Sequence, residues 1–267
     1  MRSKENAPVR RGAECKSNHQ ETKMSDAHPK IKGTVAMLKN VAACMATMER
    51  LRDRGGGRPG LGVFYGHSGY GKTYAAIYVQ NKTNAARVEV GDSWTRKVFL
   101  EKLCLELGVE PKGTIAALVD RAVETLLDDD RPLIIDEADK LVDKGMIELV
   151  RQLQEESGAP ILLLGEEKLP SKLEKVERVH NRVLVWEPAQ PCDLADARSL
   201  ARLVSPIEIS DELLDRVRAA SSGRARRIVV NLDLLTEHAR NNGLKALSGD
   251  DFHGDFYTGA APRPRGA

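Results

Sequence analysis

A glycine-rich octapeptide is the part of the chain whose residue types and spacing point most directly to chemistry. It is a complete G-x-x-x-x-G-K-T phosphate loop, made of Gly66, His67, Ser68, Gly69, Tyr70, Gly71, Lys72 and Thr73. The glycines let the backbone curl so that successive N–H groups face a polyphosphate. The lysine of such a loop supplies positive charge to the β- and γ-phosphates, and the threonine hydroxyl ligates Mg²⁺. The octapeptide therefore predicts binding of a nucleoside triphosphate with Mg²⁺.

A second group of candidate residues ends the apolar run Leu133–Ile135, which is followed by Asp136 and Glu137. On a strand that comes after a phosphate loop, such an aspartate holds Mg²⁺ through water and the glutamate polarises an attacking water. We therefore expect Asp136 to share the metal with Thr73 and Glu137 to be catalytic. Asp139 is expected to be a helix N-cap or a solvated residue in preference to a third metal ligand.

These residues need a framework that brings them together, and the pattern of the chain predicts one. Strand-like and helix-compatible runs alternate up to about residue 188, which favours an α/β fold with a mainly parallel sheet and helices on both faces. The expected strands are 63–65, 86–90, 133–136, 160–164 and 182–186. The expected helices are 34–52, 73–81, 93–107, 114–127, 139–156 and 169–176.

Prolines at 188 and 191 mark a boundary, after which we expect helices only, at 193–203, 211–220 and 224–241. A small helical lid is the simplest interpretation of this segment. The N-terminal stretch is polar, with more Lys and Arg than Asp and Glu, and is expected to be a disordered basic arm. The expected division is therefore an arm (1–32), a nucleotide-binding α/β domain (33–188), a lid (189–250) and a flexible tail (251–267).

Composition excludes several classes of protein. The 267 residues, 41% of them hydrophobic, suit one large or two small domains. No apolar run is long enough to span a membrane and the N-terminus has no apolar segment, so we expect a cytoplasmic protein without a membrane partner. The four cysteines lack C-x-x-C spacing, which argues against a zinc site or a disulfide framework. The net charge of +2 leaves nucleic-acid binding open, because a balanced total can hide a basic face.

The chain resembles the AAA+ ATPases and, within them, the DNA-transposition regulators of the phage Mu B and TnsC types and, more distantly, the IstB type. The resemblance covers roughly residues 34–242 and is carried by the phosphate loop, the strand ending in Asp136 and Glu137, the run 161–169 and the stretch 222–227. It implies a three-layer AAA+ domain with a lid, slow and assembly-dependent ATP hydrolysis, a filament or ring on duplex DNA, and a transposase as partner. The alternatives are a helicase loader or an NTP-dependent interaction module without DNA binding.

The same resemblance implies roles for several arginines. Arg178 and Arg182 lie where this family places the arginine finger that reaches into a neighbour's nucleotide site, and we prefer Arg182. A guanidinium there stabilises charge that develops on the γ-phosphoryl group. Arg226 is expected to be the second sensor, a lid arginine that binds the nucleotide, with Arg227 as the competing choice.

DNA contact is expected at two helix starts. In the transposition regulators these elements line the inner face of a spiral that tracks the DNA backbone, and recognition is largely independent of sequence. The alternative is a solvated helix start at which the tryptophan packs into the core. The residues expected to contact DNA are Trp94, Arg96, Lys97, Lys112 and Thr114.

One residue departs from the family pattern. After the run 161–165, AAA+ proteins usually present a small polar residue to the γ-phosphate, whereas this chain has Glu166. A carboxylate there would be repelled by the phosphate charges unless a cation intervenes. Either the register differs by one residue or hydrolysis is slow.

Overall fold

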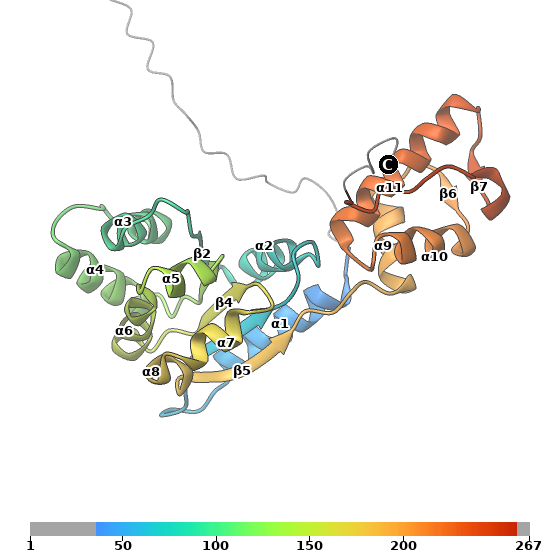
Figure 1. The fold of residues 1–267 in the computed structure, drawn as a ribbon. Coiled ribbons are helices and arrows are strands. Elements are labelled where there is room, and N and C mark those ends of the chain that lie inside the picture. The colour runs from blue at the N-terminus through green and yellow to red at the C-terminus, as the bar shows by residue number, and fades with distance from the viewer. Residues whose placement is uncertain (1–35, 261–267) are drawn as a thin grey trace, which may run out of the picture. The chain divides into compact units, whose positions relative to one another are not determined.

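The computed structural model describes residues 36–260, and a five-stranded parallel sheet with the strand order β2-β3-β4-β1-β5 organises its α/β part (Figure 1). The pairings β1 with β4, β1 with β5, β2 with β3 and β3 with β4 are all parallel, so the carboxyl ends of the strands lie at one edge. The expected α/β fold is confirmed. The strands are β1 Leu61–Tyr65, β2 Ala86–Glu89, β3 Leu133–Asp136, β4 Ile161–Gly165 and β5 Val183–Pro188.

Helices cover both faces of the sheet, which gives three layers. Along β4, Leu162 and Leu164 pack in one cluster with α1 and α2, whereas Ile161 and Leu163 pack in the other with α3, α4 and α6. Alternate side chains of a strand point to opposite faces, so a strand buried on both sides is apolar throughout. These helices are α1 Lys39–Arg52, α2 Lys72–Thr83, α3 Arg96–Leu107, α4 Ile115–Asp128, α5 Asp139–Asp143, α6 Ile147–Ser157, α7 Leu169–Glu174 and α8 Glu177–His180.

Helix boundaries differ from the sequence predictions at identifiable residues. The helix expected at 139–156 is two helices, α5 and α6, separated by Gly145 with φ +62°. A left-handed glycine commonly ends a helix, because other residues carry a steric penalty there. The short helix α8 was not predicted, and α1 begins at Lys39 instead of residue 34.

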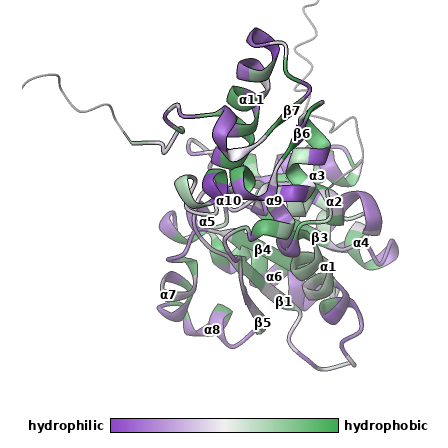
Figure 2. Cartoon of the chain, turned by 90° about the vertical axis from the view of Figure 1, so that its right-hand side faces the viewer, coloured by the Kyte–Doolittle hydropathy of each residue, from purple (hydrophilic) through white to green (hydrophobic). Residues whose placement is uncertain are grey.

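Figure 2 shows green, hydrophobic residues gathered along the strands, while α7 and α8 are largely purple.

Beyond β5 comes the segment predicted to be a lid, for which we keep the name lid, with helices α9 Leu194–Val204, α10 Asp211–Ala220 and α11 Ala225–Asn241. The expectation of helices only was wrong here, because β6 Glu208–Ile209 pairs in parallel with β7 Ala246–Leu247, and a 3-10 turn, η1, follows at Gly249–Asp251. Two-residue strands are too short to show an alternating pattern in the sequence.

No helix within residues 36–260 is both long enough and apolar enough to cross a membrane. The arm (1–32) lies outside the described residues, and the four-part division of the chain stays a prediction.

Candidate functional site at the carboxyl edge of the sheet

The phosphate loop joins the carboxyl end of β1 to α2, which begins at Lys72. Gly69 and Gly71 adopt φ +87° and +86°, the left-handed region that favours glycine. The Lys72 ammonium donates hydrogen bonds to the carbonyls of Gly66 at 2.6 Å and His67 at 3.0 Å, so the loop curls around its own lysine. Burial lowers the pKa of Lys72, while the charges of nearby carboxylates oppose this shift.

Asp136, at the end of β3, lies beside the loop. Its carboxylate is buried beside the Thr73 side chain, and its Oδ1 accepts a bond from the backbone N–H of Glu137 at 3.0 Å. Burial raises the pKa of Asp136, and the neighbouring Thr73 side chain and the charge of Arg87 counteract that rise. The structure therefore brings together the two residues that the sequence assigned to Mg²⁺.

Glu137 occupies an unusual backbone conformation, with φ +58°. Non-glycine residues in the left-handed region carry a steric cost, and they cluster at functional sites. The Glu137 carboxylate lies 3.8 Å from the ammonium of Lys140, and 43% of its side chain is exposed. Burial raises the pKa of Glu137, while Lys140 lowers it. The backbone turn thus holds a partly solvated carboxylate next to Asp136.

Glu166 also lies near this site. Its negative charge acts on both Lys72 and Glu137, and its side chain is exposed. Its backbone N–H donates to Asp139 at 2.7 Å, and Asp139 is buried and pairs with Lys172 at 3.3 Å. The expectation that Asp139 is a helix cap or solvated was therefore wrong, because the turn after β3 points its carboxylate at the end of β4. Both alternatives for Glu166 stay open.

A buried arginine that the sequence did not single out lies behind Asp136. The Arg87 guanidinium, from β2, is 3.4 Å from the Asp136 carboxylate and 3.5 Å from that of Glu89. Its Nε donates to the side chain of Gln80, on α2, at 3.3 Å. Arg87 belongs to no motif, and only the strand order, which places β2 next to β3, brings it to the site.

The start of α11, in the lid, contacts the phosphate loop. The Arg224 guanidinium donates to the carbonyl of Ser68 and lies over the Tyr70 ring, 5.8 Å from its centroid. Arg226 contributes its backbone N–H to the carbonyl of Gly69 at 3.3 Å, while its side chain is exposed. Arg227 faces Gly259, away from the loop: a Cβ built at Gly259 would lie 2.8 Å from the Arg227 guanidinium. Sequence reasoning therefore missed Arg224, the lid arginine whose side chain touches the loop.

The two candidate finger residues lie at the opposite edge of the sheet, just before β5. Arg182 forms an ion pair with Glu155 at 2.6 Å and remains 47% exposed. Arg178, on α8, is exposed and forms no ion pair with any residue in the range 36–260. Arg182 also lines a cavity of about 810 Å³ together with Arg54 and Arg58. Because the loop and these arginines occupy opposite edges, neither arginine joins the site of its own chain.

Each of the five residues expected to contact DNA has a local structural role or partner. Arg96 donates to the carbonyl of Gly145 at 3.0 Å, and Lys97 pairs with Glu101 at 3.7 Å. Lys112 pairs with Glu110. Thr114 caps the start of α4, and Trp94 is half-buried against the core. Surface ion pairs of this kind are weak, so they do not prevent these cations from meeting phosphate.

Comparison with known proteins supports the same kind of fold. Residues 54–173 match the family described as AAA domain, while no curated protein sequence matches the chain. Cdc6p from Pyrobaculum aerophilum is similar in structure (18% identity, TM-score 0.57, 79% of this chain and 64% of that chain). The Aeropyrum pernix Orc1 protein in complex with DNA is also similar in structure (17% identity, TM-score 0.57, 82% of this chain and 64% of that chain). A third similar structure is the Thermotoga maritima RuvB Holliday junction branch migration motor (15% identity, TM-score 0.52, 79% of this chain and 66% of that chain).

The chain spans 64% of the length of the Cdc6p chain and of the Orc1 chain. At these identities the likeness shows the fold, and the family match adds the AAA domain. The α/β part of this chain therefore has the P-loop AAA+ fold, and the family match supports ATPase activity.

Proposed function

We propose that this AAA+ protein is an ATP-dependent regulator of DNA transposition, which assembles on duplex target DNA without sequence preference and recruits or activates a transposase. The observation that carries the ATP-dependent part is the meeting of the phosphate loop, Thr73, Asp136 and Glu137 at one edge of the sheet. The DNA and transposase parts rest on the similarities of the chain.

The loop residues fit a polyphosphate. Among the described residues, the N–H groups of Gly69 and Gly71 have no hydrogen-bond partner, and both glycines leave the backbone unobstructed. Lys72 is held by two loop carbonyls, from which it can turn to the β- and γ-phosphates of ATP. The lid arginine that would meet the nucleotide is Arg226 or, from its contact with Ser68, Arg224.

Thr73 and Asp136 fit Mg²⁺, which binds proteins through one or two oxygen ligands together with substrate phosphates and water. No cluster of three His, Cys, Asp or Glu side chains suited to a metal occurs in residues 36–260. When bound, Mg²⁺ neutralises charge on the phosphates.

Glu137 would orient and polarise the water that attacks the γ-phosphate. Arg182 or Arg178 would reach this site from a second copy of the chain, because both lie at the opposite edge of the sheet from their own phosphate loop. Hydrolysis would then require two subunits in contact, and a chain that assembles on DNA would hydrolyse ATP mainly in the assembled state.

The proposed DNA contact has two supports. The structure of the Aeropyrum pernix Orc1 protein is a complex with DNA, and RuvB is a Holliday junction branch migration motor. In addition, Arg96, Lys97 and Lys112 are exposed cations at helix starts, where backbone N–H groups also favour phosphate. The choice of a transposase as partner rests on the sequence resemblance.

Electron microscopy of the protein with duplex DNA and a non-hydrolysable ATP analogue tests this proposal. We expect filaments or rings that need both ligands and that dissociate as salt is raised. Preference for single strands together with binding to a helicase would favour a helicase loader. ATP-dependent self-association that ignores DNA would favour an interaction module.

A further inference from the structure

Three successive carbonyls of the phosphate loop are held by groups from outside the loop. The carbonyl of Ser68 accepts from the Arg224 side chain, that of Gly69 from the Arg226 backbone at 3.3 Å, and that of Tyr70 from the Asn40 amide at 2.8 Å. A peptide unit is planar, so a carbonyl held outward turns the following N–H in the opposite direction. These outside groups therefore orient the N–H groups that would bind phosphate.

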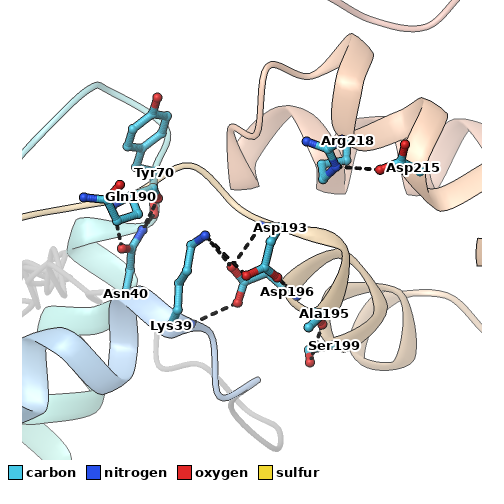
Figure 3. Close-up of polar contacts among 10 residues, drawn as sticks. All are labelled: Lys39, Asn40, Tyr70, Gln190, Asp193, Ala195, Asp196, Ser199, Asp215 and Arg218. Carbon is cyan, nitrogen blue, oxygen red and sulfur yellow. Dashed lines mark hydrogen bonds and ion pairs between the residues drawn. The ribbon is translucent and has the colours of Figure 1, made fainter.

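Asn40, in the first turn of α1, connects the loop to the segment 189–193 that joins β5 to the lid, which we name the hinge. Its Nδ2 also donates to the carbonyl of Gln190 at 2.7 Å, and its Oδ1 accepts from the backbone N–H of Gln190 at 2.8 Å (Figure 3). The residue is 3% exposed. A reversed amide would place its oxygen against two carbonyls, so the hydrogen bonds define its orientation.

The neighbouring residue ties the same helix start to the lid itself. The backbone N–H of Lys39 donates to the Asp196 carboxylate, on α9, at 2.9 Å, and the Lys39 ammonium lies 3.3 Å from Asp193 (Figure 3). Leu38, the N-cap residue of α1, offers no side-chain cap, so a lid carboxylate takes that role. The first turn of α1 therefore holds the phosphate loop, the hinge and the lid.

We propose that Asn40 is a positioning residue that couples the lid to the phosphate loop. The inference rests on the proposed binding of ATP at this loop. A lid movement that displaces Gln190 must break or drag the Asn40 bonds, and the Tyr70 carbonyl moves with them. Buried polar groups without partners are costly, so the loop and the hinge change position together instead of one at a time.

Asn40→Asp tests this coupling with almost no change in size. The carboxylate still accepts from Gln190 but places an oxygen against two carbonyls, which releases Tyr70. We expect ATP affinity to fall by about tenfold or more, as the removal of one or two buried hydrogen bonds would give. Asn40→Ala, which removes the bonds without adding charge, serves as a second variant if the first does not fold.

Asn231→Asp is the matched control. Asn231 is fully buried in α11 and holds Tyr257 in the same way, donating to its carbonyl at 3.0 Å and accepting from its N–H at 2.7 Å, but it does not contact the phosphate loop. We expect this variant to lose thermal stability while ATP affinity stays within about twofold of wild type. Equal losses of affinity in the two variants would reduce Asn40 to a stabilising residue and overturn the proposal.

Hydrogen exchange separates coupling from simple loss of affinity. At saturating ATP we expect the wild-type protein to show slower exchange in both the loop and the hinge, whereas Asn40→Asp protects the loop and leaves the hinge unchanged. If both Asn40 variants bound ATP with wild-type affinity and showed wild-type slowing of exchange in the hinge, the proposed coupling would be overturned. The proposed binding of ATP would be unaffected by that result. Failure of the wild-type chain to bind ATP would overturn the proposed function and, with it, this inference.

Discussion

The two edges of the central sheet differ in how their charged residues are satisfied. Four residues converge at the carboxyl edge and contact one another or the loop backbone, namely Lys72, Thr73, Asp136 and Glu137. At the amino edge, the Arg182 guanidinium pairs with the Glu155 carboxylate of its own subunit and with no other side chain in residues 36–260, and it remains 47% exposed. One chain thus gathers the residues proposed to bind ATP at one edge of its sheet, whereas the arginines proposed to complete hydrolysis lie at the other edge.

Solvent exposure sharpens this difference. Asp136 and its partner Arg87 are buried, so removing either partner leaves a charge that water cannot stabilise. The ion pair between Arg182 and Glu155 is at the surface, where such pairs contribute about 0.2–1 kcal/mol. A neighbouring subunit could therefore recruit Arg182 at little cost, while the carboxyl edge would keep its arrangement.

The largest effect is expected at the carboxyl edge. Lys72→Ala should abolish measurable ATP binding, because the lysine supplies the charge that meets the phosphates. Glu137→Gln should keep ATP affinity and lower turnover by about a hundredfold or more, because it removes only the group that polarises water. Calorimetry and phosphate release measure the two effects. Wild-type turnover in Glu137→Gln would show that the base is a different residue.

The amino edge should also affect turnover, but only between subunits. Arg182→Ala should bind ATP normally and hydrolyse it poorly in the assembled state. Mixing this variant with Lys72→Ala should restore part of the activity, since some interfaces then pair an intact loop with an intact arginine. The same experiment with Arg178→Ala in place of Arg182→Ala shows which of the two arginines acts between subunits. Absence of rescue by either mixture, when the proteins demonstrably co-assemble, would argue against a trans-acting arginine.

An intermediate effect is expected on DNA binding. Replacing Arg96, Lys97 and Lys112 together by alanine should leave ATP binding intact and weaken duplex binding for all sequences alike. The slope of log affinity against log salt should fall by about one for each phosphate that a protomer no longer neutralises. A chain truncated to begin near residue 28 is the control for the basic arm. An unchanged slope in the triple variant, together with failure of the truncated chain to bind, would assign DNA binding to the arm.

The smallest effect should come from freeing Arg182. Glu155→Gln removes its intramolecular partner, and we expect turnover of the assembled protein to rise by at most about fivefold, the range of a surface ion pair. Turnover at low protein concentration should not change. A rise that is independent of concentration would place Arg182 in a role within its own subunit.

The sequence predicted the residues of the site that belong to contiguous motifs. The phosphate loop and the strand ending in Asp136 have local spacing that carries their chemistry, and the structure brings them together. Arg87, Arg224 and Asn40 escaped prediction because none has a local pattern. Strand order brings Arg87 to the site, lid packing brings Arg224, and the packing of α1 against α2 brings Asn40. The alternation of strands and helices sufficed for the α/β fold, but not for β6 and β7, which are two residues long.

The dependence of ATP turnover per subunit on protein concentration, with and without duplex DNA, tests most directly whether the site is completed by a second chain. We expect turnover to be very low in dilute protein, to rise steeply with concentration, and to reach its maximum at lower concentration when duplex DNA is present. Arg182→Ala should flatten this rise. A turnover per subunit that is constant across concentrations, unaffected by DNA and equal in Arg182→Ala and Arg178→Ala, would contradict an active site shared between subunits.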